Sequence, residues 1–166
     1  MIVVERTFAV TAAPGIVLGY LRDFANAAEW DLSARRTTRV GDGPIAPGAR
    51  WRHVRKVLWV TAELTYTLIT DEPGRLLFHG RNEGATSIDT VQIRPAPGGT
   101  EVSYQVELEL HGLAKLATAL VRVEVEKLAT AAVEVATTSL SGPTPARRRL
   151  GAATPSRLPT PAEETG

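Results

Sequence analysis

Polar and apolar residues alternate along most of the chain between positions 34 and 110, with the period of two that is typical of half-buried β-strands. The clearest run is residues 102–110, in which Val, Tyr, Val, Leu and Leu alternate with Ser, Gln, Glu and Glu. Clusters of Gly, Pro and Asp interrupt the pattern at residues 41–44, 47–48, 71–74 and 97–99. Together with an alternating N-terminal run, the pattern predicts strands at residues 2–10, 35–40, 49–57, 59–70, 75–82, 87–94 and 102–110.

Helical spacing of apolar residues is found only outside the run of strands. A first short helix is predicted from Pro14, with Thr11 as its cap, and a second short turn over residues 26–30. A long amphipathic helix is predicted over residues 113–140. Its predicted apolar stripe consists of Leu113, Ala117, Leu120, Val121, Leu128, Ala131 and Val135.

This order of elements indicates an α+β protein with a helix-grip fold. We expect a curved antiparallel sheet of about seven strands to wrap around the long C-terminal helix, with two short helices after the first strand. A sheet that curls around one helix leaves space between the two layers. The pattern therefore predicts a cavity for a small molecule, without naming that molecule.

The chain of 166 residues is long enough for one domain, which we expect to span residues 1–141. Residues 142–166 hold five of the 11 prolines and three consecutive arginines, so we predict a disordered Pro- and Arg-rich tail there.

Residues 1–141 carry 15 basic and 16 acidic side chains, a balance that argues against nucleic acid as a partner. Cysteine is absent, the N-terminus lacks the basic segment of a signal peptide, and no apolar run reaches 18 residues. We therefore expect a cytoplasmic protein without stable membrane insertion, as a monomer or homodimer. Arginine supplies 16 of the 19 basic residues, which is typical of high-GC genomes such as those of actinobacteria.

Short motifs carry a resemblance that extends over residues 2–141. They are Leu21-Arg-Asp-Phe24, Glu29-Trp30-Asp31, Gly48-Ala-Arg-Trp-Arg52, Asp71-Glu-Pro-Gly-Arg75-Leu and Gly98-Gly-Thr-Glu-Val-Ser-Tyr104. In this order the chain resembles the SRPBCC superfamily, which includes START-like lipid-transfer domains and the polyketide cyclase/dehydrase family. Ala28 departs from the pattern, since the family often has Pro there. The resemblance implies the fold, a cavity and no cofactor, but no particular reaction, because the superfamily shares no catalytic motif.

Glu124 is the first candidate for chemistry, because the helical period places it within the apolar stripe, near Leu120 and Leu128. A buried carboxylate costs several kcal/mol unless it is paired or protonated. Burial would raise its pKa, and such a group can bind a ligand hydroxyl or act as a general acid or base. The structural alternative is a glutamate at the open edge of the sheet, or one paired with an arginine.

His53 and Arg55 share one face of their predicted strand with Trp51, and the large apolar Trp51 favours the inward direction for all three. An inward His53 is a candidate general base near neutral pH. Arg55 is a candidate to bind a ligand carboxylate, to stabilise an enolate oxygen or to neutralise Glu124. A slip of one residue would turn all three outward, and His53 has the alternative role of a hydrogen-bonded structural residue.

Other side chains are candidates for ligand contact because of their size, their polar groups or their expected position beside the cavity. They are Tyr20, Trp30, Trp51, Tyr66, His79, Tyr104, Leu116 and Leu120. The tyrosines can orient a phenolic ligand or serve as ordinary core residues, and His79 can face either way. The three histidines, at positions 53, 79 and 111, lack the spacing of metal ligands, so no metal site is predicted.

The sequence thus predicts a domain that binds a hydrophobic or aromatic small molecule between the sheet and the C-terminal helix. In the enzymatic interpretation, the resemblance implies cofactor-free cyclisation or dehydration of a polyketide-like substrate. Glu124 or His53 would move the proton, and Arg55 would stabilise an enolate. The alternatives are a non-catalytic carrier or sensor of a lipid or metabolite, and a protein-interaction domain of the same fold.

Overall fold

The computed structural model describes residues 1–141, and the predicted disordered tail of residues 142–166 lies outside the described residues. One antiparallel sheet of seven strands has the order β1-β7-β6-β5-β4-β3-β2. Its strands are β1 (Ile2–Val10), β2 (Ala34–Val40), β3 (Arg50–Val57), β4 (Val60–Glu72), β5 (Arg75–Arg81), β6 (Ala85–Ala96) and β7 (Gly99–Leu110). The helical segments are α1 (Pro14–Arg22), η1 (Phe24–Asn26), α2 (Ala27–Trp30), η2 (Gly112–Ala117) and α3 (Thr118–Ser141).

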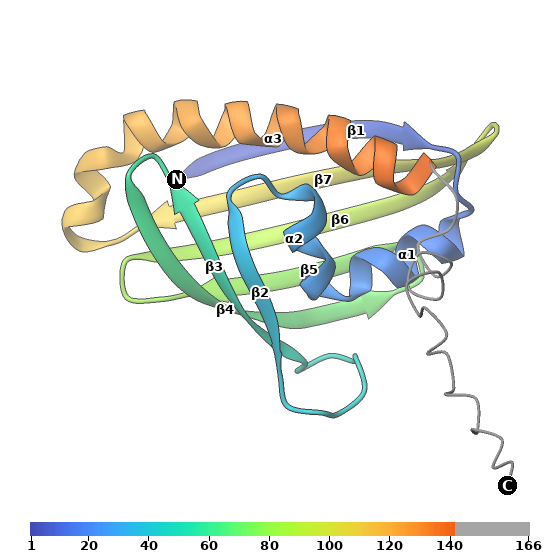
Figure 1. Cartoon of the computed structure of the whole chain (residues 1–166), viewed down its shortest axis with the longest axis horizontal. Helices are drawn as coiled ribbons and strands as arrows, with labels where there is room; N and C mark the ends of the chain where they lie inside the picture. Colours follow the sequence, from blue (N-terminus) through green and yellow to red (C-terminus); the bar gives the residue numbers. More distant parts are fainter. Residues whose placement is uncertain (142–166) are drawn as a thin grey trace, which may run out of the picture.

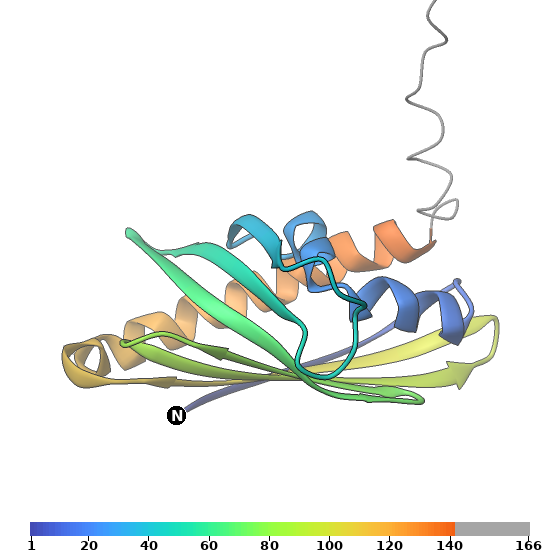
Figure 2. The ribbon, with the colours of Figure 1, turned by 90° about the horizontal axis from the view of Figure 1, so that it is seen from below.

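The helices α1, α2 and α3 lie on one side of the sheet, and strands β2 and β3 curl towards them (Figure 1; Figure 2). The long helix α3 packs mainly along the edge strand β1 and against α2. This arrangement confirms the predicted helix-grip fold and the predicted order of its elements. Among residues 1–141, no helix is long and apolar enough to cross a lipid bilayer.

Alternation along the strands decides which side chains face the helices, because neighbouring residues point to opposite faces of a sheet. The structure also decides which residues of β4 and β5 face inward. The inner face carries Trp51 and His53 of β3, Leu64, Tyr66 and Leu68 of β4, and Leu76 and Phe78 of β5, all of them buried. His79 therefore points to the outer face.

Strand β1 buries Ile2, Val4 and Val10 on the inner face, and Arg6 is the polar exception on that face. The Arg6 guanidinium reaches helix α3, where Nη2 donates to Thr130 Oγ1 at 3.2 Å and to the Glu126 carbonyl oxygen at 3.3 Å. Arg6 thus connects the edge of the sheet to the helix that covers it.

Helix α3 differs from its prediction in its start and in its buried face. The predicted start at Leu113 is wrong, since residues 112–117 form the separate 3₁₀ segment η2. Leu113 and Leu116 are each 87% exposed, so no packing holds them in a continuous helix. The buried face includes Val125, Ala136 and Leu140 rather than Leu113 and Leu120. Relative to the predicted stripe, this face is turned by roughly one residue, or about 100°.

Helix α1 begins at Pro14 as predicted, but the predicted cap by Thr11 is wrong. Ala13 occupies the N-cap position and no side chain caps the helix. The Thr11 hydroxyl instead donates to the carbonyl oxygen of Ser141 at 3.3 Å. Thr11 therefore ties the end of β1 to the end of α3.

Candidate functional site

A cavity lies between the inner face of the sheet and α3, with residues of the α1–α2 region as a further wall. It comprises about 850 Å³ of space between atoms, counted out to the solvent at its mouth. The wall formed by α3 is aliphatic and consists of Val125, Leu128, Ala129, Ala132, Val133 and Ala136. The cavity therefore offers a predominantly apolar surface to a ligand, as small-molecule sites generally do.

Aromatic rings form much of the wall opposite α3. Phe24 stacks on Tyr66 with ring centroids 4.3 Å apart, and Trp30 meets Tyr104 edge to face at 5.3 Å. All four rings border the cavity. The cavity thus presents both faces and edges of aromatic rings.

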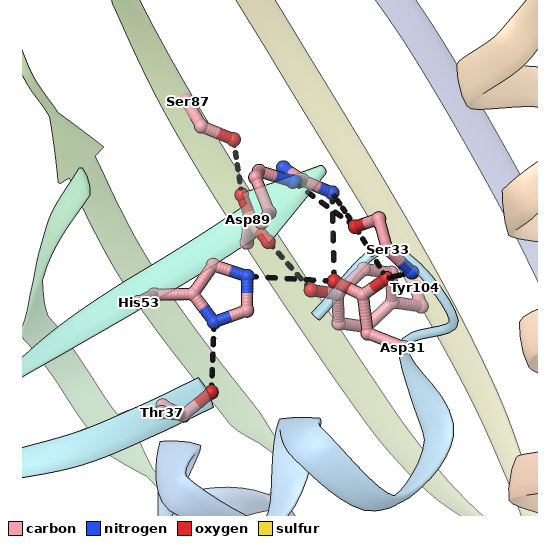
Figure 3. A network of polar contacts seen from close by, with 8 residues as sticks. Asp31, Ser33, Thr37, His53, Ser87, Asp89 and Tyr104 are labelled. Atoms are coloured by element: carbon pink, nitrogen blue, oxygen red, sulfur yellow. Dashed lines mark hydrogen bonds and ion pairs between the residues drawn. The ribbon is translucent and has the colours of Figure 1, made fainter. Parts of the chain in front are cut away.

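Asp31 follows α2 directly and enters the cavity wall (Figure 3). Its Oδ1 accepts hydrogen bonds from the Ser33 backbone N–H at 2.8 Å and from the Ser33 hydroxyl at 2.7 Å. Its Oδ2 lies 3.5 Å from both Arg55 Nη2 and His53 Nε2. Burial alone would raise the pKa of Asp31, but the Arg55 charge and the hydrogen bonds from His53 and Ser33 outweigh it. The pKa of Asp31 therefore lies well below its usual range.

Arg55 is one of two arginines that line the cavity, the other being Arg6 at its β1 side. The Arg55 Nε and Nη2 donate to Ser33 Oγ at 3.1 and 2.9 Å. Burial alone would lower the pKa of Arg55, but the neighbouring Asp31 charge outweighs this effect and the pKa lies above its ordinary value. Within residues 1–141, Nη1 has no hydrogen-bond acceptor. Arg55 is therefore held in place by one edge of its guanidinium and retains donors for a ligand oxygen.

Asp89, on the inner face of β6, is the second carboxyl group of the cavity (Figure 3). Its Oδ1 accepts from the Ser87 hydroxyl and its Oδ2 from the Tyr104 hydroxyl, both at 2.5 Å. Burial raises the pKa of Asp89, and these hydrogen bonds and the Arg55 charge oppose that rise only in part. Asp31 and Asp89 thus have pKa values displaced in opposite directions within one cavity, the arrangement that separates an acid from a base.

Among the predicted site residues, Arg55, Tyr66, Tyr104 and Trp30 line the cavity. Trp51 and His53 point inward as predicted, but both are at most 1% exposed and lie behind the cavity wall. His53 connects two elements, since its Nδ1 is 2.8 Å from Thr37 Oγ1 and its Nε2 faces Asp31 (Figure 3). His53 therefore supports Asp31 and does not itself reach a ligand.

The placement of Glu124 in the cavity is wrong. Glu124 is partly buried on α3, but Val125 takes the position that faces the sheet, and Glu124 does not line the cavity. The same rotation of the helix turns Leu120 away from the cavity, to 47% exposure, and Leu116 lies in η2, before the helix begins, where it is 87% exposed.

His79 and Tyr20 also lie outside the cavity wall. His79 alternates with the buried Phe78 and Gly80, so it belongs to the outer face of the sheet. Tyr20 is buried, but its hydroxyl donates to Glu29 Oε2 at 2.8 Å. Tyr20 therefore fixes α1 to α2 and does not meet a ligand.

Asp31 and Asp89 are the functional candidates that sequence reasoning missed. A signal for Asp89 was present, because it is in phase with the apolar Val91 and Ile93 on its strand. Asp31 stands in the Glu29-Trp30-Asp31 motif, but its partners Ser33, His53 and Arg55 come together only through the pairing of β2 with β3 and the turn that precedes it.

A family model described as polyketide cyclase / dehydrase and lipid transport matches residues 1–142. The Zhui aromatase/cyclase from a Streptomyces species has a TM-score of 0.69 and 14% identity, over 90% of this chain and 96% of that one. A START superfamily protein from Mycobacterium smegmatis has a TM-score of 0.59 and 13% identity, over 80% and 97%. TTHA0849 from Thermus thermophilus has a TM-score of 0.63 and 19% identity, over 81% and 96%. At these identities the structures support the fold alone, and no curated protein matches the chain.

Proposed function

Since the chain belongs to the polyketide cyclase / dehydrase and lipid transport family, and with it to the SRPBCC superfamily, we propose that it binds a hydrophobic or aromatic small molecule that carries an acidic oxygen. The observation that carries the proposal is Arg55. A guanidinium lies in an otherwise largely apolar cavity, is fixed by Asp31 and Ser33, and keeps Nη1 without an acceptor within residues 1–141. A carboxylate, phenolate or enolate oxygen would complete its hydrogen bonding.

The remaining walls support the apolar part of the ligand. The aliphatic face of α3 and the rings of Phe24, Trp30, Tyr66 and Tyr104 enclose the same space. Burial of a flat ring system between such surfaces provides most of the binding free energy, and the Arg55 guanidinium orients the ligand. Arg55 therefore sets which end of the bound ligand faces β3.

A pair of matched probes tests this proposal. We expect the protein to bind naphthalene-2-carboxylate, and the substitution Arg55→Met to weaken that binding by about 10- to 100-fold, because a charged hydrogen bond is lost. Binding of 2-methylnaphthalene, which has the same ring but no charge, is expected to change little. Fluorescence titration of each probe measures both affinities.

The substitution Arg94→Met is the control, because Arg94 is an exposed cation on the outer face of β6. It is expected to leave both affinities unchanged. Equal binding of the two probes by the unmodified protein would contradict the role of Arg55, and binding of neither probe would contradict the proposed site.

A cofactor-free enzyme that moves protons on such a ligand is the second candidate, and the opposite pKa shifts of Asp31 and Asp89 favour it. Ionised Asp89 would be a stronger base than an ordinary carboxylate and could take a proton from the carbon next to a ligand carbonyl. Arg55 would stabilise the enolate oxygen that results. When protonated Asp89 donates to Tyr104, the Tyr104 hydroxyl is free to donate to a ligand oxygen. These are the proton transfers that cyclisation and dehydration require.

Hydrogen–deuterium exchange at the α-carbon of 1-tetralone separates the enzyme from a carrier. For an enzyme, we expect the protein to accelerate this exchange in D₂O, and Asp89→Asn to slow it by about 100-fold or more because the base is lost. Arg55→Met is expected to slow it too, and Arg94→Met to leave it unchanged. NMR of the tetralone methylene signal measures the rate. Binding of naphthalene-2-carboxylate without any accelerated exchange would indicate a non-catalytic carrier or sensor.

A further inference from the structure

One end of the molecule exposes large apolar side chains that neither the core nor the cavity uses. Trp59 and Val60, at the turn between β3 and β4, are 75% and 54% exposed. Leu113 and Leu116 of η2 are each 87% exposed, and Leu120 at the start of α3 is 47% exposed. Figures 1 and 2 both place the β3–β4 turn at the same end of the molecule as η2 and the start of α3. We refer to Trp59, Val60, Leu113, Leu116 and Leu120 as the apolar end.

The backbone conformation of the β3–β4 turn indicates that these exposed side chains have a role other than folding. Leu58 has a φ of +56°, a left-handed conformation that is costly for a branched residue and that favours Asn or Gly. The chain instead carries Leu58 and Trp59 as the only residues between the two strands. Folding alone does not explain this choice, because a polar turn would be more stable and more soluble. Departures of this kind are expected where a surface meets a partner.

Basic residues flank the exposed apolar side chains along the two segments that carry them. Residues 43–62 and 110–123 contain Arg, Lys and His but no Asp or Glu, whereas exposed Glu63 and Glu109 adjoin these segments and exposed Glu83 lies in the neighbouring β5–β6 turn. Two of the three lysines of the chain, Lys56 and Lys115, flank the exposed apolar residues, and both are exposed. Arg122 is exposed one turn further along α3. Exposed apolar side chains with these three cations beside them are complementary to an anionic lipid surface, which offers acyl chains beneath phosphate groups.

We propose that the apolar end docks on the surface of an anionic lipid bilayer. Trp59 and the leucines of η2 enter the region between headgroups and acyl chains, where the indole ring is favoured. Lys56, Lys115 and Arg122 contact the lipid phosphates, each contributing about 1 kcal/mol near the surface. The protein does not span the bilayer and returns to solution when the surface charge is screened.

The apolar end also continues into the walls of the cavity. Strand β3 runs from Arg55, which lines the cavity, to the turn at Leu58 and Trp59. Helix α3 runs from the exposed Leu120 to Val125 and Leu128, which line the cavity. A hydrophobic ligand dissolved in the bilayer would thus reach the cavity along apolar surface. This passage rests on the proposed function, whereas docking itself does not.

Sedimentation of the full chain with lipid vesicles tests the proposal. We expect binding to vesicles of phosphatidylcholine with phosphatidylglycerol, weaker binding to phosphatidylcholine alone, and release by salt. Trp59 is far more exposed than Trp30 or Trp51, so a blue shift of tryptophan fluorescence on binding reports its entry into the lipid. The triple substitution Trp59→Ser, Leu113→Ser and Leu116→Ser is expected to weaken vesicle binding by about 10- to 100-fold and to remove the blue shift.

The double substitution Val3→Ser and Ile69→Ser is the matched control, because both residues are 47% exposed but belong to other surfaces of the sheet. It is expected to leave vesicle binding unchanged. The proposal would be overturned if the triple variant bound vesicles as tightly as the unmodified protein does. Binding driven by Arg147–Arg149 would give this result, because the triple variant retains these three arginines. A dimer in solution that the triple variant dissociates, without vesicle binding, would assign the apolar end to a second copy of the chain.

The two proposals fail in different ways. Naphthalene-2-carboxylate binding is measured without vesicles, and vesicle binding is measured without any ligand. Loss of naphthalene-2-carboxylate binding with intact vesicle binding would overturn the proposed function alone. The reverse result would overturn docking alone.

Discussion

Replacement of Asp31 by asparagine is expected to lower the free energy of unfolding at pH 7 by about 3–5 kcal/mol, because it leaves the buried Arg55 without its counter-ion. Asp31 Oδ2 lies 3.5 Å from Arg55 Nη2, and the Arg55 side chain is only 17% exposed. Asparagine keeps an oxygen that can accept hydrogen bonds from the Ser33 N–H and hydroxyl. The fall in the free energy of unfolding therefore measures the loss of the Asp31 charge and not the loss of the turn. Denaturation by urea, followed by circular dichroism, measures the effect.

A double variant and a control sharpen this prediction. Adding Arg55→Met to Asp31→Asn removes the uncompensated charge and is expected to recover part of the lost stability. Asp42→Asn changes an exposed carboxylate in the loop between β2 and β3, and it is expected to alter stability by no more than about 0.5 kcal/mol. If Asp31→Asn lowers the free energy of unfolding by no more than Asp42→Asn does, the Asp31–Arg55 ion pair does not hold Arg55 in the cavity.

The pH dependence of the Asp31 variant has a defined sign. The pKa of Asp31 is lower in the folded protein than in the unfolded chain, where it is about 4. The folded state therefore gains stability from ionised Asp31 above about pH 4, and loses that stability as the pH falls towards the folded pKa. The difference in unfolding free energy between the unmodified protein and Asp31→Asn is thus expected to shrink below pH 4.

The fold was accessible from the sequence because strands and turns are specified locally. Alternation in residues 49–57 and 102–110 identifies strands whose one face is buried, and the turn at residues 71–74 separates the two strands beside it. In that turn Gly74 has a φ of +78°, and a side chain there would meet the carbonyl oxygen of Ile93 at 2.8 Å. Glycine at this position is therefore both a turn signal and a packing requirement.

The sequence did not reveal which face of α3 is buried, because apolar residues surround much of the first half of the helix. Leu120 and Val123 of α3 are exposed, as are Leu113 and Leu116 of the preceding η2, yet the predicted buried stripe includes Leu113 and Leu120. A helical-wheel projection of the sequence cannot distinguish an apolar face that packs on the sheet from an apolar face that meets a partner. The error over Glu124 follows directly, and the proposed docking on lipid gives those exposed residues a role.

The candidate site could be predicted only in part from the sequence, for a related reason. Trp51 fixed the direction of β3, and Arg55 follows from the parity of that strand. His53 shares the parity but lies farther from the cavity, against Phe24 and Tyr66. The partner of Arg55 comes from a turn 24 residues earlier, and such a long-range contact has no signature in local periodicity.

Phe24→Ala is expected to lower the free energy of unfolding by about 3–5 kcal/mol, because it opens a void in the aromatic cluster that borders the cavity. Phe24 is 5% exposed and lies 4.3 Å from the Tyr66 ring and 4.9 Å from the Phe78 ring, measured between centroids. Phe24→Leu conserves most of the volume and is expected to cost about 1 kcal/mol. Urea denaturation of the two variants beside the unmodified protein tests the ordering.

The same substitution is expected to reach the ligand site. Phe24 begins η1, and the preceding Asp23 accepts from the Ala25 N–H at 3.0 Å and from Trp51 Nε1 at 3.1 Å, which ties this segment to β3. Asp31 lies seven residues further along, so loosening of the segment displaces the carboxylate that fixes Arg55. Phe24→Ala should therefore weaken naphthalene-2-carboxylate binding more than Phe24→Leu does. Unchanged binding by a destabilised Phe24→Ala would mean that β3 alone positions Arg55, without support from the segment that carries Asp31.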